Sequence, residues 1–254
     1  MCTKIAPLLF LFVLHFADGR SQDNPLKLRV MTYNTAHANP DRAASVIRKY
    51  NPDIVALQEI DKNNGRSGRH TDQAKEIAEK LGMSFQFFKA IGYADGEYGI
   101  AILSKYPIKS TQKTELPGAG EHRVMGAAYI DLGHGKEMVF ACTHMDPDLD
   151  ANGKIKQIKT IVDALADDRV PVVLAGDLNC QLDTPMIDFL DQYYTRACTC
   201  KCLPSCPNPT PFEYIDHIAF RKADPFTFTY YDVPNEVSPS DHRPVLAELF
   251  LKLE

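Results

Sequence analysis

Short apolar runs of strand length outnumber helical patterns in this chain, and this imbalance constrains the fold more than any other feature. Runs that alternate apolar and polar residues, or stay apolar for four to eight residues between turn signals, are typical of strands. The expected strands are 28–34, 53–60, 84–91, 99–106, 123–132, 137–144, 170–178, 214–222, 226–233 and 244–253.

Helical patterns are few. Ala74, Ile77, Ala78 and Leu81 recur at helical spacing and Gly82 follows as a stop, so the pattern predicts a helix over 71–81. Further helices are expected over 42–50, 155–165 and 184–193. The second half has too few helices for strict strand–helix alternation. The sequence therefore favours an α/β (α+β) fold in which two mixed sheets pack together with helices outside.

The N-terminus has the layout of a secretory signal peptide. Lys4 precedes a short apolar stretch from Leu8 to Phe16, and small residues follow at a plausible cleavage position, so a signal peptide is expected over 1–19. The stretch is shorter than the roughly 20 apolar residues of a transmembrane helix, and no second segment is long enough to span a bilayer. We expect one domain over 28–254, secreted to an extracellular or periplasmic location, monomeric and without stable membrane insertion.

Cysteine usage fits export. Cys2 falls inside the expected signal, which leaves six of the seven cysteines, and four of these crowd into CTCKCLPSC within a Cys/Pro-rich loop at 195–213. Disulfides and a zinc cluster are the two alternatives. An oxidising compartment favours disulfides, and no histidine accompanies the cluster. We predict that all six are oxidised, that the clustered cysteines pair beyond their immediate neighbours, and that Cys142 and Cys180 can reach each other or the cluster.

Composition and net charge limit the classes of binding partner. Hydrophobic residues make up 44% of the chain and charged residues 24%, ordinary values for a globular protein with a sizeable core, and the net charge is −5. A broad nucleic-acid-binding face is usually basic, so nucleic acid is a possible but disfavoured partner. A local phosphate site is still compatible with this charge.

Polar side chains recur where the apolar strands end. The stretch AGDLNCQ illustrates the two interpretations, because Asp177 and Asn179 either form a turn or project to the same side and address one ligand. Each such residue has a plain structural explanation on its own, but the ordered set favours a site. Its members are Asn34, Glu59, His144, Asp177, Asn179, Asp216, Asp241 and His242.

The residue types in this set point to phosphate chemistry. Carboxylates and amides are the ligands of a hard cation such as Mg²⁺ or Mn²⁺. A histidine beside a carboxylate suits proton transfer or stabilisation of a charged oxygen. Together they predict metal-assisted attack of water on a phosphate ester.

These motifs also carry a family resemblance. VMTYN, DIVALQEID, YGIAILSKYPI, CTHMD, VVLAGDLN, YIDHI and SDHRPVLAEL resemble, in this order, the endonuclease/exonuclease/phosphatase superfamily. The resemblance covers about residues 28 to 250. It implies a four-layer sandwich of two packed mixed sheets flanked by helices, with the site at one edge.

The resemblance also implies roles. Glu59 matches the principal metal-binding acid, Asn34 its amide partner, and Asp241 is assigned both to the metal and to orienting His242. Asp177 and Asn179 match the pair that activates water and contacts phosphate. The catalytic set that the resemblance implies is His144, Asp177, Asn179, Asp216, Asp241 and His242. Whether Asp177 or His242 is the general base stays open.

Two departures from the family pattern are visible. The first motif continues as NTAHA, and the Cys/Pro-rich loop is an addition that either shapes selectivity or clamps a surface loop. The sequence predicts a secreted Mg²⁺- or Mn²⁺-dependent phosphoesterase, with phosphodiesters favoured over phosphomonoesters. Nuclease, lipid and inositol phosphoesterase activities stay open. The alternatives from other classes are a non-catalytic binding module that retains the fold and a disulfide-stabilised structural protein.

Overall fold

The computed structural model describes residues 25–252 apart from 119, 167–168, 199–200 and 237–238. The predicted signal peptide and Cys200 lie outside the described residues. Within the described part, no helix is long and apolar enough to cross a membrane.

In the described part of the chain, twelve strands form two six-stranded sheets, the first and the second sheet. In spatial order, the first sheet consists of β11 (Phe226–Asp232), β12 (Val245–Leu251), β1 (Leu26–Asn34), β2 (Ile54–Lys62), β4 (Gly96–Ser104) and β3 (Ser84–Tyr93). The second consists of β5 (Ile108–Leu116), β6 (Arg123–Gly133), β7 (Lys136–His144), β8 (Val172–Asp177), β10 (Asp216–Arg221) and β9 (Tyr194–Arg196). Each sheet contains one parallel pair, β1 with β2 and β7 with β8, and is otherwise antiparallel.

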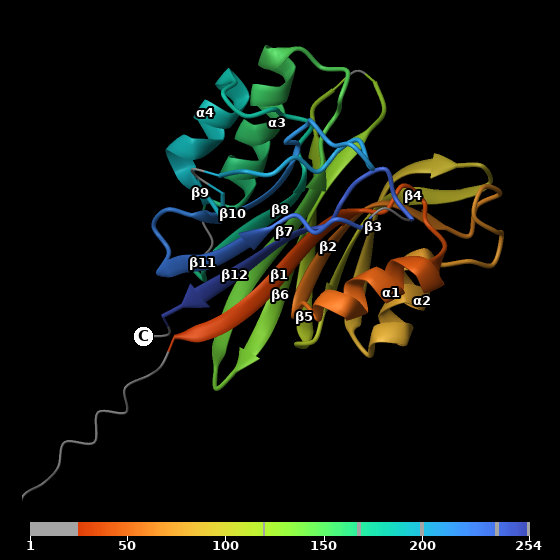
Figure 1. Cartoon of the computed structure of the whole chain (residues 1–254), viewed down its shortest axis with the longest axis horizontal. Helices are drawn as coiled ribbons and strands as arrows, with labels where there is room; N and C mark the ends of the chain where they lie inside the picture. Colours follow the sequence, from red (N-terminus) through yellow and green to blue (C-terminus); the bar gives the residue numbers. More distant parts are fainter. Residues whose placement is uncertain (1–24, 119, 167–168, 199–200, 237–238, 253–254) are drawn as a thin grey trace, which may run out of the picture.

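Three apolar clusters hold four layers together. Residues such as Val30 and Phe140 face each other between the sheets, so this cluster forms the central core. Helices α1 (Pro40–Tyr50) and α2 (Gln73–Leu81) cover the outer face of the first sheet, and α3 (Ala151–Ala164) and α4 (Pro185–Tyr193) cover that of the second. Figure 1 shows the two helix pairs on opposite sides of the molecule. The predicted four-layer sandwich of mixed sheets is confirmed.

The helix ends follow local sequence signals. The Asp72 carboxylate accepts a hydrogen bond from the backbone N–H of Lys75 at the start of α2, and Gly82 ends that helix with a left-handed backbone. Asp150 caps α3 in the same way through the N–H of Gly153. A cap that lies before residue 155 explains why α3 begins at Ala151, earlier than its apolar pattern indicates.

Two strands were not predicted. β5 lies at an edge of the second sheet, pairs only with β6, and exposes most of its polar residues to solvent. An edge strand with few buried side chains lacks the alternation that marks a strand in sequence. β9 is a three-residue strand that pairs with β10, so the Cys/Pro-rich loop starts after Arg196 rather than at 195.

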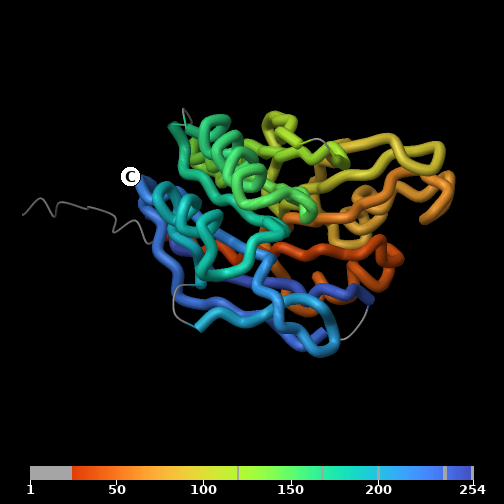
Figure 2. Tube along the Cα trace, turned by 90° about the horizontal axis from the view of Figure 1, so that it is seen from above, coloured from red at the N-terminus to blue at the C-terminus, as the bar shows by residue number. Residues whose placement is uncertain are grey.

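Pairing of distant segments creates the edge where the site lies. β1 pairs with β12 near the two ends of the described chain, and Figure 2 shows these red and blue segments side by side. His144 at the end of β7 is in register with Asp177 at the end of β8, and Asp216 opens β10 opposite Asp177. The ends of β1, β7 and β8 and the start of β10 therefore bring their polar residues together.

Candidate active site

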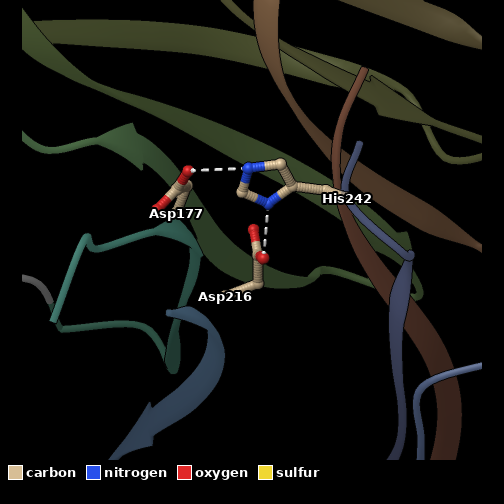
Figure 3. A group of neighbouring side chains, drawn as sticks. All are labelled: Asp177, Asp216 and His242. Carbon is tan, nitrogen blue, oxygen red and sulfur yellow. Dashed lines mark hydrogen bonds and ion pairs between the residues drawn. The ribbon is translucent and has the colours of Figure 1, made fainter. Parts of the chain in front are cut away.

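A buried chain of Asp177, His242 and Asp216, linked by one hydrogen bond and one ion pair, forms the centre of the candidate site (Figure 3). Nδ1 of His242 donates to Oδ2 of Asp216 at 2.8 Å, and its Nε2 lies 3.8 Å from Oδ2 of Asp177. The imidazole thus lies between two carboxylates supplied by adjacent strands, β8 and β10. This arrangement can hold one nitrogen of the ring while the other faces a reacting group.

The prediction that Asp241 orients His242 is wrong, because Asp216 makes that hydrogen bond. Asp241 is exposed, and its carboxylate lies 3.5 Å from the hydroxyl of Ser240. Asp241 and His242 lie in a bend before β12, with Asp241 exposed and His242 buried, so proximity in sequence was a poor guide to the partner of the imidazole. Its role as a metal ligand is untested and stays a prediction.

Burial and the charge of Asp216 shift the pKa values of Asp177 and His242. Burial raises the pKa of the Asp177 carboxyl to about 7, and the nearby charge of Asp216 acts in the same direction. Burial opposes protonation of His242, but the charge and hydrogen bond of Asp216 outweigh it and raise the imidazole pKa to about 12. At neutral pH the ring is therefore a cation, and Asp177 is poised to exchange a proton.

Asn34 and Glu59 form a second part of the site on the first sheet. Nδ2 of Asn34 lies 3.2 Å from Oε1 of Glu59 and 3.1 Å from Oδ2 of Asp177, and so joins the two parts. Glu59 lies in an irregular stretch of β2, where the register with β4 shifts between Leu57 and Ile60. Its φ of 58° is left-handed, a strained value that points the carboxylate away from the strand's regular direction.

His37 covers the Glu59 carboxylate and was not among the predicted site residues. Its Nε2 lies 3.0 Å from Oε2 of Glu59, and its Nδ1 lies 3.2 Å from the Glu59 backbone oxygen. Burial would raise the pKa of Glu59, but the hydrogen bonds from His37 and Asn34 outweigh burial and hold it at about 2. The departure NTAHA was the available signal, because it places a histidine three residues after Asn34.

His144 lies beside Asp177 on the second sheet, and Arg123, at the start of β6, lies near His144. Nε2 of His144 lies 3.6 Å from Oδ2 of Asp177, and burial together with the nearby Arg123 cation lowers the imidazole pKa to about 3. His144 is therefore a neutral donor. Arg123 is only 9% exposed, and its Nε has no hydrogen-bond partner among the described residues. No sequence motif indicates Arg123 as a site residue. Its burial and its proximity to His144 in the structure identify it.

The turn after β8 is both a turn and part of the site. β8 ends at Asp177, and Asn179 has a left-handed φ of 48°, so the two do not share one face of a strand. Instead, the Asn179 backbone N–H donates to Oδ1 of Asp177, and its side chain donates to the Met145 backbone oxygen. Gly176 is required here, because a Cβ would lie 2.1 Å from the Thr143 oxygen.

Most of the predicted site residues meet at one edge. Hydrogen bonds or short approaches link Asn34, Glu59, His144, Asp177, Asn179, Asp216 and His242. His217 lies apart from them, because its Nε2 contacts the Cys180 backbone oxygen at 3.0 Å as an ordinary buried imidazole.

The donor chemistry fits a hard divalent cation. The ionised, partly exposed carboxylate of Glu59 is the type of ligand that Mg²⁺ and Mn²⁺ prefer. The Asn34 amide beside it offers an oxygen of the same type, although here its Nδ2 faces Glu59 and its Oδ1 accepts from the Ala36 N–H. Ligand atoms of Asp177, Asp216 and His242 also lie within 4.8 Å of one another and could hold an ion. In that second group the hydrogen bond between His242 and Asp216 already accounts for the short spacing.

The prediction that all six cysteines are oxidised is wrong for the described residues. Cys198 and Cys202 pair with each other, whereas Cys142, Cys180 and Cys206 are buried free thiols. The Cys142 sulfur lies 3.3 Å from Nε2 of Gln58 in the core between the sheets. A cysteine held there packs as a small apolar residue and does not project toward the loop.

Comparisons with known proteins agree with this geometry. Residues 31–242 match the model of the Endonuclease/Exonuclease/phosphatase family. The chain belongs to this family. The uncharacterized protein YbhP of Escherichia coli K12 is 25% identical over 219 residues, which cover 81% of this chain and 86% of YbhP.

Two solved structures illustrate the shared fold. A family protein from Beutenbergia cavernae superposes with a TM-score of 0.72 at 22% identity, covering 89% of this chain and 72% of that one. A mannosyl-6-phosphatase from Bacteroides thetaiotaomicron superposes with a TM-score of 0.67 at 19% identity, covering 87% of this chain and 99% of that one. At these identities the likeness is one of fold.

Proposed function

We propose that this protein hydrolyses phosphate esters with the help of a divalent cation, Mg²⁺ or Mn²⁺. The observation that carries the proposal is the buried Asp177–His242–Asp216 chain, joined through Asn34 to the ionised carboxylate of Glu59. A set that served only to stabilise the fold would not need a strained backbone at Glu59 and a carboxyl whose pKa is near neutrality.

Asp177 is the general base in this proposal. Its pKa of about 7 lets the carboxylate take a proton from water near neutral pH, and the Asn34 amide holds the oxygen that faces the site. His242 stays protonated against Asp216, so its Nε2–H donates to an oxygen on which negative charge develops. We thus propose Asp177, and not His242, as the general base that the sequence left open.

Glu59 and Asn34 would hold the cation, with Asp241 as a further candidate ligand. When bound, the cation polarises a phosphate oxygen and stabilises the leaving oxygen. The neutral His144 and the buried Arg123 would provide donors for phosphate oxygens. The residues of this chain thus surround a phosphate with donors, while Asp177 faces the attacking water.

Phosphodiesters remain the preferred substrate class on the breadth of the family. The solved relative described as a mannosyl-6-phosphatase keeps phosphomonoesters under consideration, and the net charge of −5 disfavours a nucleic acid. Secretion and a monomeric state belong to the proposal as well. N-terminal sequencing of protein recovered from the medium or periplasm should find residues 1–19 removed.

A substrate panel tests the proposal. Bis(p-nitrophenyl) phosphate, p-nitrophenyl phosphate, inositol phosphates, sphingomyelin and DNA are offered with Mg²⁺, with Mn²⁺ and after exhaustive chelation. We expect cation-dependent turnover of at least one ester by the wild type and by Asp163→Asn, an exposed control on α3, but not by Asp177→Asn. Absence of turnover across the panel, with a folded protein, would favour a binding module that retains the fold.

A further inference from the structure

The Cys/Pro-rich loop contributes a buried hydroxyl to the candidate site. Ser205 is 1% exposed, and its Oγ donates to Oδ2 of Asp216 at 2.6 Å. The same Oδ2 accepts the hydrogen bond from Nδ1 of His242. Ser205 and His242 therefore share one carboxylate oxygen.

These two bonds account for how the carboxylate is held. Oδ1 of Asp216 is buried and has no hydrogen-bond partner among the described residues. Among the hydrogen bonds of the described residues, only those that Oδ2 accepts orient the carboxylate. Without Ser205, the only side-chain donor to Asp216 among the described residues would be the imidazole that Asp216 itself has to orient.

The loop also holds the backbone on both sides of His242. The Asn208 N–H donates to the Asp241 oxygen at 2.6 Å, and the Arg243 N–H donates to the Ser205 oxygen at 2.8 Å. Within the loop, the Ser205 N–H donates to the Glu213 oxygen. Ser205 is thus fixed by its own backbone at both its N–H and its C=O.

We propose that Ser205 is a positioning residue of the reaction, which acts through Asp216 to set the orientation of the His242 imidazole. The proposal rests on the proposed function, because it assigns Ser205 to the same site. It gives the Cys/Pro-rich loop a role beyond that of a clamp on the surface: the loop completes a Ser–Asp–His arrangement in which the serine is not a nucleophile.

Four variants test the proposal. Ser205→Ala removes the hydroxyl, and Ser205→Thr restores one. Thr210→Ala removes an exposed hydroxyl of the same loop, and Ser67→Ala removes the equivalent 2.6 Å bond to a different buried carboxylate, that of Asp61. Each is assayed for kcat, KM and melting temperature on the best ester of the panel, and for the downfield proton resonance of the His242 Nδ1–H in the full-length protein.

We expect Ser205→Ala to lower kcat by about tenfold or more, in keeping with loss of a hydrogen bond to a charged group, while KM stays nearly unchanged. The His242 proton resonance should shift or broaden, and Ser205→Thr should recover both readouts. Thr210→Ala should change neither, and Ser67→Ala should lower the melting temperature without moving the resonance.

An unchanged His242 resonance in Ser205→Ala would overturn the inference, whether or not an ester is hydrolysed. So would a fall in kcat of Ser67→Ala as large as that of Ser205→Ala, since it would reduce the effect to general loss of stability. The resonance does not depend on a substrate, so failure of the proposed function and failure of this inference are distinguishable.

Discussion

Two buried aspartates, Asp61 and Asp216, have the same kind of serine partner and different cationic partners. Each accepts a 2.6 Å hydrogen bond from a loop serine, Ser67 or Ser205. Asp61 is also held by Nε and Nη2 of Arg66 at 2.9 and 2.6 Å, whereas Asp216 is held by the imidazole of His242. Both aspartates thus bind a serine hydroxyl and a cationic side chain, but the cation is a guanidinium at Asp61 and an imidazolium at Asp216.

The difference separates a structural network from a chemical one. A guanidinium keeps its charge at all relevant pH values, so Arg66 can close a loop but cannot exchange a proton. Arg66 also stacks on the rings of Tyr93 and Tyr98, which fixes it further. An imidazole has a second nitrogen that can donate or accept, and in His242 this nitrogen faces Asp177.

The largest contrast is expected between Asp216→Asn and Asp61→Asn. Loss of the Asp216 charge should lower kcat by about 10²- to 10⁴-fold, the usual contribution of acid–base groups, because the imidazolium loses its counter-ion. Asp61→Asn should leave kcat nearly unchanged and lower the free energy of unfolding by about 2 kcal/mol. Steady-state kinetics and urea unfolding measure the two. Equal kcat losses would erase the distinction between the networks.

A second, smaller effect is expected on Mn²⁺ affinity, for which Glu59→Gln is compared with Asp61→Asn. Glu59→Gln removes a charge with little change in volume, so it should weaken Mn²⁺ binding by at least about tenfold. Loss of a residue that only hydrogen-bonds to a metal ligand already lowers metal affinity by about this factor. Isothermal titration of the chelated protein with Mn²⁺ measures this. Asp61→Asn, two residues along the same strand, serves as the control. Unchanged Mn²⁺ affinity in Glu59→Gln would move the cation away from this carboxylate.

The smallest effect is a pH dependence that belongs to Asp61. Burial would raise the pKa of this carboxyl, but Arg66 and Ser67 hold it below its usual value. The stabilisation is therefore complete above the unfolded-state pKa of about 4 and is lost as the pH falls through the lower folded-state pKa. The difference in unfolding free energy between wild type and Asp61→Asn should shrink between about pH 5 and pH 3. A difference that stays constant over this range would exclude the ionised pair as its source.

The sequence predicted the sandwich because its strands are internal and apolar. Residues 53–60 and 170–178 bury most of their side chains in the cores, so their sequences are largely apolar. The edge strand β5 is mostly exposed, and its sequence has no such apolar pattern. The fold then brings strand ends together at one edge, which is why most polar residues at those ends were identified in advance.

What sequence could not supply was the partner of each group. Asp241 adjoins His242 along the chain, yet Asp216 reaches it from β10 across 26 residues. His37 and Ser205 reach the site through left-handed backbone and loop hydrogen bonds, neither of which has a periodic signal. Cys142 stays a free thiol because the core between the sheets encloses it.

Hydrolysis in H₂¹⁸O tests the central claim most directly, that Asp177 activates water for attack on phosphorus beside a bound cation. With the best ester of the panel and Mg²⁺ or Mn²⁺, mass spectrometry of a single turnover should find one ¹⁸O in the phosphate product and none in the alcohol. Chelated enzyme and Asp177→Asn should produce almost no labelled phosphate over the same time. Label in the alcohol, or full labelling of phosphate by chelated Asp177→Asn, would contradict the account.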